Sequence, residues 1–172
     1  TSVPTSAILV SKTADTPDFI AYREADCLIE KEQVPDALLK TADIFHTTCF
    51  ALSRNPAQNT ILEKAQIAAA AGCLISIDLN YSEKIWPDRN EAMEIIKRYC
   101  SFQPIVKVSM DDMERLLGPY TSMEDLFEFL HKHGAQLVCF TRGGNGVVVS
   151  QKGKDHIHMP AIPLNSVVDA TG

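Results

Sequence analysis

Two segments of the chain carry side chains that could contact a ligand. Asp78 and Asn80 stand at the end of the apolar run CLISIDL, and Ser109 and Asp112 follow the run PIVKV at the start of a helical pattern. Open α/β sheets bind ligands outside the carboxyl ends of their strands. Asp78 and Asn80 are expected at such an edge, with Asp112 in a first helical turn that favours negative charge.

A third segment, LVCFTRGGNGVVVS (137–150), places Thr141 and a glycine-rich stretch between two apolar runs. The glycines favour a hairpin, because they supply the positive φ that a tight turn needs. The same glycines would leave backbone amides bare enough to approach a nucleotide. Both interpretations stay open from this segment alone.

Several common catalytic signatures are missing from the sequence. It contains no GxxxxGK[ST] loop, no GxGxxG after a strand and no HExxH, which disfavours a P-loop ATPase, an ordinary Rossmann dehydrogenase and a zinc protease. The formal net charge of -6 disfavours nucleic acid and anionic membrane as partners, because both attract basic surfaces. A small molecule or another protein is the expected partner.

The composition fits one soluble cytoplasmic domain of 172 residues. The 5 cysteines are widely spread and form no CxxC pair, so buried reduced thiols fit them better than disulfides or a zinc site. No secretory leader is apparent, and no apolar run approaches the roughly 18 residues that span a bilayer. The chain opens on Thr1 and closes on the apolar run NSVVDATG, so both ends are expected to be cuts.

The elements that must position these residues alternate along the chain. The β-prone runs 5–11 and 18–23 predict a hairpin, and Trp86 is the predicted packing anchor for the helix after it. Strands separated by helices indicate a parallel sheet with helices on both faces, and the last strands should form an antiparallel edge. The run 73–79 is the predicted central strand, buried on both faces. Strands are predicted over 43–46, 73–79, 104–108, 137–141, 146–150 and 155–160, and helices over 56–71, 88–100, 110–117 and 122–133.

Taken in order, these motifs resemble those of one family. The series is D-x-N…W (78–86), K-x-S-x-x-D…L-x-G (107–118), T-x-G-x-x-G (141–146) and V-V-D-x-T-G (167–172). It is similar to the PfkB/ribokinase family of carbohydrate kinases, and the match runs over most of residues 42–172. The resemblance implies a three-layer ribokinase-like α/β fold, forming a single domain fragment over residues 1–172 that is incomplete at both ends.

The resemblance also implies a mechanism. In the family, a D-T-G-A-G-D loop leads into a helix whose first amides hold the transferred phosphoryl group, and the last Asp is the general base for the sugar hydroxyl. Amides fixed beforehand stabilise the charge that develops on the phosphoryl oxygens. Gly172 would begin this anion hole, and the catalytic Asp is expected just after Gly172. The fragment alone is therefore expected to be inactive, and the catalytic claim fails if Ala-Gly-Asp or a near variant does not follow.

The resemblance also implies which residues contact the cofactors, because they stand at the matching positions of the family motifs. Asp112 would hold magnesium through water, and Asp169 with the Thr171 carbonyl would fall where some members bind a monovalent cation such as potassium. The implied ATP contacts are Ser109 near the phosphates and Thr141, Gly143 and Gly146 along the cleft.

The early segment FIAYREADCLI (19–29) resembles fructokinases and 2-keto-3-deoxygluconate kinases, in which an aromatic–Arg pair faces the sugar. Tyr22, Arg23 and Asn80 are therefore candidate substrate residues, although ordinary strand surface is an equal alternative for Tyr22 and Arg23. Residues 5–23 would include part of a β lid through which such kinases often form homodimers. The family often has Arg where this chain has Ser82, so any charge that Arg gives to a phosphate or sugar acid must come from elsewhere or is not needed.

The implied activity is ATP-dependent phosphorylation of the primary hydroxyl of a sugar or sugar acid, with fructose and 2-keto-3-deoxygluconate as the first candidates. Two alternatives stay open. One is a non-catalytic nucleotide- or sugar-binding member of the same fold, and the other is a nucleoside kinase. The expected partners are ATP and a small-molecule sugar.

Overall fold

The computed structural model describes residues 2–11 and 18–163, which form a small antiparallel sheet and a 6-stranded mixed sheet. The strands are β1 (Ala7–Val10), β2 (Phe19–Tyr22), β3 (Ile44–Thr48), β4 (Leu74–Asp78), β5 (Ile105–Ser109), β6 (Leu137–Thr141), β7 (Val147–Gln151) and β8 (Ile157–Met159). The helices are α1 (Asp36–Leu39), α2 (Ala57–Ala70), α3 (Arg89–Cys100), α4 (Met110–Leu117) and α5 (Met123–Lys132). Shorter 3₁₀ turns are η1 (Ala25–Cys27), η2 (Lys31–Gln33), η3 (Ala51–Ser53) and η4 (Gly143–Asn145).

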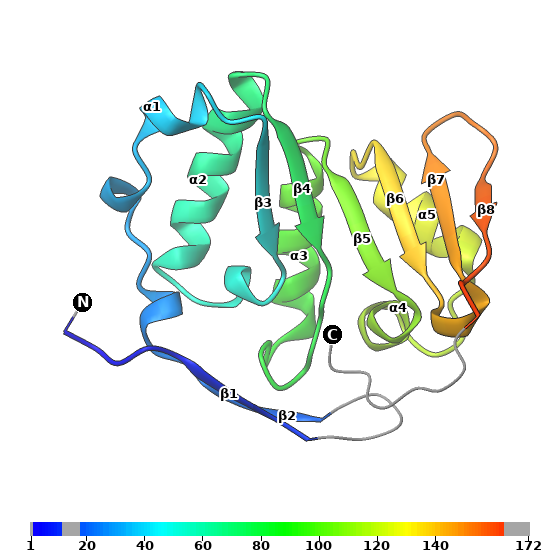
Figure 1. Cartoon of the computed structure of the whole chain (residues 1–172), viewed down its shortest axis with the longest axis horizontal. Helices are drawn as coiled ribbons and strands as arrows, with labels where there is room; N and C mark the ends of the chain where they lie inside the picture. Colours follow the sequence, from blue (N-terminus) through cyan, green and yellow to red (C-terminus); the bar gives the residue numbers. More distant parts are fainter. Residues whose placement is uncertain (1, 12–17, 164–172) are drawn as a thin grey trace.

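The large sheet keeps the order of the chain, β3-β4-β5-β6-β7-β8 (Figure 1). Strands β3 to β6 run parallel, and β7 and β8 return antiparallel. Parallel neighbours need a crossover connection, and α2, α3 and the pair α4 and α5 supply the three crossovers between β3 and β6. The predicted parallel sheet with an antiparallel edge is confirmed.

The predicted elements agree with the structure to within 2 residues at their ends. Helix α2 ends before Gly72, whose φ of +90 stops the helical path, and serine caps begin α4 and α5. The short helix α1 and the 3₁₀ turns were not predicted, because elements this brief carry no measurable hydrophobic period.

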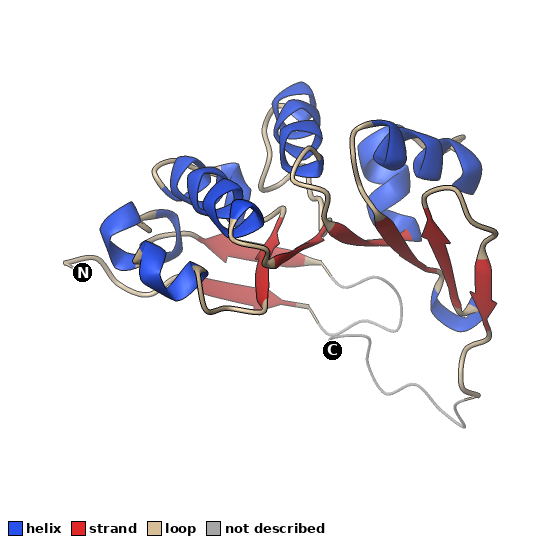
Figure 2. Cartoon of the chain, turned by 90° about the horizontal axis from the view of Figure 1, so that it is seen from above, coloured by secondary structure: helices blue, strands red, loops and turns tan. Residues whose placement is uncertain are grey.

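Helices α2 to α5 cover one face of the large sheet (Figure 2), and the predicted helices on its other face are not found among the described residues. Burial alternates along β4, where Ile75 and Ile77 are buried toward the helices and Leu74 is 43% exposed on the other face. The prediction that the run 73–79 is buried on both faces is therefore wrong. Its alternate side chains have no second layer of described residues to pack against.

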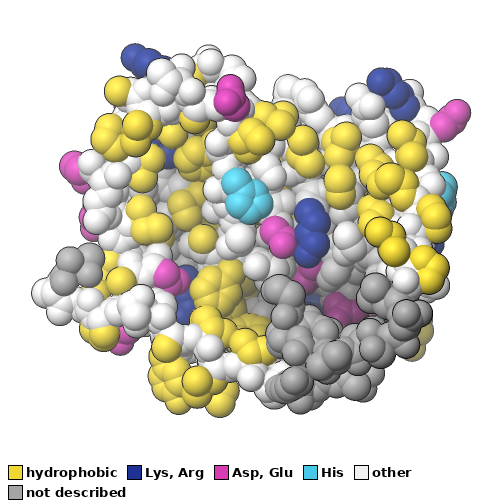
Figure 3. All heavy atoms as spheres, viewed as in Figure 1, with side chains coloured by type: hydrophobic (Ala, Val, Ile, Leu, Met, Phe, Trp, Pro, Cys, Tyr) yellow, Lys and Arg dark blue, Asp and Glu magenta, His cyan; other side chains and the backbone are white. Residues whose placement is uncertain are grey.

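The side of the large sheet that the described helices leave uncovered is its open face. Figure 3 looks onto it and shows hydrophobic side chains spread across it, with a few charged groups between them. Ile44, Ile157 and Met159 are among its exposed hydrophobic residues. In the part of the chain that the structure describes, none of the helices has the length and apolar character needed to cross a bilayer.

Strands β1 and β2 form the predicted hairpin, in a sheet separate from the large one. Phe19 and Ala21 pack against the main core. The outer residues are unusually apolar for a surface, and the exposed ones are Ile8, Leu9, Val10, Ile20 and Tyr22. The 5 cysteines are free thiols, and all except Cys139 are buried.

Candidate active site

The carboxyl ends of β4, β5 and β6 bring three predicted site segments side by side. The parallel register pairs Asp78 with Lys107 and Ser109 with Thr141. These side chains lie on the open face, because they alternate with buried strand residues such as Val108. The edge thus combines one carboxylate, one amine and two hydroxyls, which are the groups that bind phosphates and sugars.

An ion pair crosses from β4 to β5 at this edge. Lys107 Nζ lies 3.0 Å from Oδ1 and 3.2 Å from Oδ2 of Asp78. The strand ends are held further by backbone bonds, from Cys49 N–H to the Asp78 carbonyl over 2.9 Å and from Leu79 N–H to the Lys107 carbonyl over 2.8 Å. Asp78 and Lys107 therefore neutralise each other and keep the edge in register.

Ser109 is the N-cap of α4 and forms a capping box with Asp112. Ser109 Oγ donates to Asp112 Oδ2 over 2.6 Å, and the Ser109 N–H donates to the same oxygen over 3.0 Å. The Asp112 N–H donates in return to Ser109 Oγ over 3.1 Å. Burial raises the pKa of Asp112, although the bonds from Ser109 oppose this. A buried carboxylate is thus fixed in the first turn of α4 by its bonds from Ser109.

The turn between β6 and β7 is the predicted hairpin. Gly143 and Gly146 have positive φ values of 53 and 81, which confirms that interpretation. A Cβ on Gly146 would lie 2.1 Å from the Met159 carbonyl oxygen, whereas one on Gly143 would meet nothing within 4 Å. The close approach of β8 therefore requires a glycine at position 146, and Gly143 leaves its backbone open beside Thr141.

Asn80 and Arg23, two of the predicted substrate residues, meet at the backbone of Phe50. The Phe50 N–H donates to Asn80 Oδ1 over 3.2 Å, and Arg23 Nη1 donates to the Phe50 carbonyl over 3.1 Å. Arg23 also donates to Ser53 Oγ over 2.5 Å and to Asp26 Oδ2 over 2.7 Å. Its side chain is only 1% exposed. In this arrangement Arg23 joins the hairpin to the segment after β3.

Tyr22 lies next to Arg23 but is 58% exposed. Tyr22 is the last residue of β2, whereas the side chain of Arg23, just after the strand, is buried, so the aromatic ring and the guanidinium group do not form a single surface. The structure brings Arg23 close to Asn80 and leaves Tyr22 apart from them. A contact of either residue with a sugar stays a prediction.

The loop after Asn80 is anchored by Trp86, which the sequence predicted as the packing anchor of the helix that follows it. Trp86 is 1% exposed, and its Nε1 donates to the Cys49 carbonyl over 3.0 Å. Tyr81 and Ile85 are buried with it. These anchors leave the polar residues between them at the surface of the loop.

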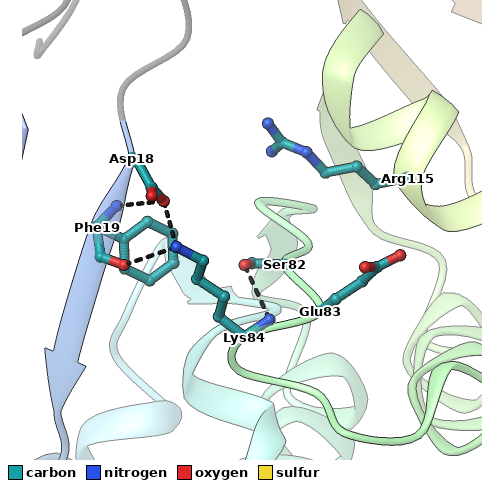
Figure 4. Close-up of a pocket in the computed structure, with 6 residues that line it drawn as sticks. All are labelled: Asp18, Phe19, Ser82, Glu83, Lys84 and Arg115. Carbon is teal, nitrogen blue, oxygen red and sulfur yellow. Dashed lines mark hydrogen bonds and ion pairs between the residues drawn. The ribbon is translucent and has the colours of Figure 1, made fainter.

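A pocket of about 260 Å³ opens between this loop, β2 and α4 (Figure 4). Its lining residues are Asp18, Phe19, Ser82, Glu83, Lys84 and Arg115. The sequence interpretation missed Lys84 and Arg115. Their spacing could have indicated them, because Lys84 follows Ser82 by two positions and Arg115 follows Asp112 by three, on neighbouring positions of one helix.

Comparisons with known proteins show the family of this chain. A family model described as pfkB family carbohydrate kinase matches residues 1–172. The chain belongs to the pfkB family of carbohydrate kinases. The ribokinase-like fold class is confirmed by solved structures of this family.

Three relatives show how far the similarity to pfkB proteins extends. An ATP-dependent 6-phosphofructokinase of Thermoanaerobacterium thermosaccharolyticum is 34% identical over 168 residues, covering 98% of this chain and 51% of the relative. The structure of Halothermothrix orenii fructokinase has a TM-score of 0.78 at 31% identity, covering 94% of this chain and 57% of that protein. Aminoimidazole riboside kinase from Salmonella enterica, solved with aminoimidazole riboside and an ATP analog, has a TM-score of 0.75 at 26% identity, covering 90% and 50%. The chain spans about half the length of these relatives.

A metal ion in this pfkB chain would have few protein ligands. Among residues 2–11 and 18–163, no group of three or more His, Cys, Asp or Glu side chains is arranged to hold one. Magnesium that arrives with nucleotide phosphates keeps several waters and needs only one or two carboxylates. Asp112 fits such a role, because it is a fixed carboxylate at a helix start. The predicted contacts Asp169, Thr171 and Gly172 lie outside the described residues.

Proposed function

We propose that the full-length protein containing these residues transfers the terminal phosphoryl group of ATP to the primary hydroxyl of a sugar or sugar acid. Fructose and 2-keto-3-deoxygluconate are the acceptors to test first. The observation that carries the proposal is the pfkB match over residues 1–172, together with Ser109 and Thr141 on neighbouring strand ends. The likeness to a fructokinase and to a phosphofructokinase supports a sugar or a sugar phosphate as the acceptor.

The candidate site residues would have different roles in the proposed reaction. Ser109, Thr141, Gly143 and Gly146 would hold the nucleotide along the ends of β5 and β6, and Asp112 would position the magnesium of ATP through water. Magnesium neutralises charge on the phosphates as the phosphoryl group leaves. The general base is expected just after Gly172, where the helix amides would stabilise the transferred group. Potassium at Asp169 and Thr171 would fix that loop.

The test is a coupled assay of ADP release by the full-length protein with ATP and magnesium. The acceptor panel contains fructose, 2-keto-3-deoxygluconate, fructose 6-phosphate, adenosine and aminoimidazole riboside, because relatives of the chain include a phosphofructokinase and a riboside kinase. Acceptor-dependent ADP release with a sugar is the expected result. ATP binding by calorimetry without phosphate transfer to any acceptor would instead support the non-catalytic alternative, and preference for adenosine or the riboside would support a nucleoside kinase.

The 172 residues alone are expected to transfer no phosphate, because the proposed base and most of the anion hole are not among them. The matched control is the full-length protein assayed beside the fragment. Sugar phosphorylation by the fragment would contradict the placement of the base after Gly172.

We also propose that the full-length protein is a cytoplasmic homodimer that pairs through the hairpin β1–β2. Five large apolar residues are exposed on this small sheet, namely Ile8, Leu9, Val10, Ile20 and Tyr22. Contiguous exposed apolar surface of this kind marks interaction sites. Light scattering should give a dimer, and the double variant Leu9→Glu with Ile20→Glu should shift it to monomer.

A further inference from the structure

The pocket lined by Ser82, Lys84 and Arg115 lies between the candidate acceptor residues and the capped helix. Ser82 follows Asn80 by two residues in the same loop, and Arg115 follows Asp112 by three residues on α4. The hairpin residues Asp18 and Phe19 close its other side. The pocket therefore adjoins the proposed active site on the side of the hairpin, away from the glycine-rich turn between β6 and β7.

Lys84 brings one positive charge to the pocket. Its Nζ donates to the Asp18 carboxylate and, over 3.3 Å, to the Phe19 carbonyl, and it lies 5.9 Å from the centre of the Phe19 ring. The hydrogen bond from Lys84 lowers the pKa of Asp18. The ammonium group is thus held at the pocket wall by the hairpin, and its side chain remains 52% exposed.

Arg115 brings a second positive charge from a different element. In Figure 4 its side chain points from α4 toward the space in front of Asp18 and Lys84. Its ion pair with Asp111 is loose, with Nη2 lying 3.8 Å from the Asp111 carboxylate. A guanidinium group offers five N–H donors in a planar fork that matches a carboxylate or phosphate. Arg115 is placed to receive such a group without first breaking a tight internal ion pair.

The pocket is small for a nucleotide. Its volume is about 260 Å³, below the range of roughly 300–1,000 Å³ typical of sites for drug-sized ligands. Asp18 and Glu83 balance the charges of Lys84 and Arg115, so the pocket has no large net charge of its own. The choice of ligand would therefore depend on hydrogen bonds from the Arg115 guanidinium group and the Ser82 hydroxyl more than on long-range electrostatic attraction.

We propose that this pocket is an anion subsite for the acceptor, in which Arg115, Lys84 and Ser82 bind a phosphate or carboxylate carried by the sugar away from the reacting hydroxyl. This inference rests on the proposed kinase function and narrows its acceptor to an anionic sugar. Lys84 and Arg115 would supply the positive charge that the neutral side chain of Ser82 does not carry.

The test compares the full-length protein with its Arg115→Ala, Arg115→Lys and Glu83→Gln variants on three acceptors. Fructose 6-phosphate tests phosphate, 2-keto-3-deoxygluconate tests carboxylate, and fructose is neutral. We expect Arg115→Ala to raise KM for the preferred anionic acceptor by about 10- to 100-fold, as loss of a charged hydrogen-bonding partner does. KM for ATP and for fructose should not change, Arg115→Lys should restore part of the loss, and Glu83→Gln should lower KM for the anion.

Arg98→Ala on α3 is the matched control, since Arg98 is an exposed arginine outside the pocket. It should behave as the unmodified protein with every acceptor. An equal effect of Arg115→Ala on fructose and on the anionic acceptors would overturn the subsite, as would a preference of the unmodified protein for fructose.

A failure of the kinase proposal can be distinguished from a failure of the anion subsite. If no acceptor is phosphorylated, calorimetry of fructose 6-phosphate and 2-keto-3-deoxygluconate binding decides the subsite separately. Binding that is weakened by Arg115→Ala but not by Arg98→Ala would uphold the pocket without the activity. Absence of binding, or equal binding by both variants, would overturn it.

Discussion

Two capping boxes with the same local geometry lie on successive helices of this chain. In the first, Ser109 Oγ lies 2.6 Å from the Asp112 carboxylate, and in the second, Ser122 Oγ lies 2.7 Å from that of Asp125. Asp112 is 5% exposed, whereas Asp125 is exposed. Burial raises the pKa of Asp112, and the hydrogen bond from Ser122 lowers that of Asp125. Identical local chemistry therefore gives a surface cap in one place and a candidate cofactor contact in the other.

The largest difference between the two boxes should appear in catalysis. Asp112→Ala in the full-length protein should lower kcat/KM for magnesium-ATP by about 10- to 100-fold, as loss of an outer ligand of a metal site does. Asp125→Ala removes the same capping interaction on α5 and should leave kcat/KM unchanged. Steady-state kinetics over a range of magnesium concentrations measures both, and equal losses would mean that Asp112 serves only as a cap.

A second pair of matched positions lies in the turn before β7. Gly146→Ala should lower the free energy of unfolding by about 1–3 kcal/mol or more, because its backbone conformation is strained for other residues and its Cβ would collide with the backbone of Met159. Gly144→Ala is the control, since a Cβ there would meet nothing within 4 Å. Urea unfolding of the two variants compares them. A stable Gly146→Ala protein would show that β8 can shift away from the turn.

The serines of the two boxes should differ in function but not in stability. Ser109→Ala and Ser122→Ala should each lower the free energy of unfolding by about 1 kcal/mol, the usual effect of losing an N-cap. Only Ser109→Ala should also raise KM for ATP, because Ser109 lies beside Thr141 at the proposed nucleotide edge. An unchanged KM in Ser109→Ala would remove Ser109 from the nucleotide contacts and leave its capping role intact.

The smallest expected effect is a difference in pH dependence. Because the pKa of Asp112 is raised in the folded state, its contribution to stability is present below its ordinary value of 3.8 and is lost as pH rises through the folded value. Asp112→Asn should therefore gain stability relative to the unmodified protein as pH rises from acid to neutral.

Asp125 should show the opposite sign. Its lowered pKa means that its contribution is present above 3.8 and is lost as pH falls through the folded value. Asp125→Asn should accordingly be less stable than the unmodified protein near neutral pH, and this difference in the free energy of unfolding should disappear as pH falls. Denaturation curves of both variants at several pH values measure the two slopes, and slopes of the same sign would contradict the assigned difference in burial.

Much of the fold could be predicted from the sequence, because its determinants are local. The start of α4 follows from Ser109 three residues before Asp112, and the end of α2 follows from Gly72 after an alanine-rich run. Alternating burial was not predicted for β4, because a short apolar run has the same pattern whether one or both faces are covered. The motif order likewise indicated the kinase family, which the comparisons then confirmed.

The site was predictable only in part. The sequence indicated Ser109, Asp112 and Thr141 as ATP and metal contacts by resemblance, and the strand register brings Ser109 and Thr141 together. The sequence did not indicate that Arg23 would donate hydrogen bonds to Asp26, Ser53 and the Phe50 carbonyl. Those partners depend on where the hairpin meets the large sheet.

The sequence by itself determined the four longer helices, the strands, the two capping boxes and the family, since each depends on residues a few positions apart or on motif order. Only the tertiary structure decided which capping box is buried, and that Lys84 would meet Asp18 across 66 residues. It also decided that Arg115 would face the same pocket. The reason is physical: burial and long-range charge contacts depend on how whole elements pack, and no local pattern of residues specifies that packing.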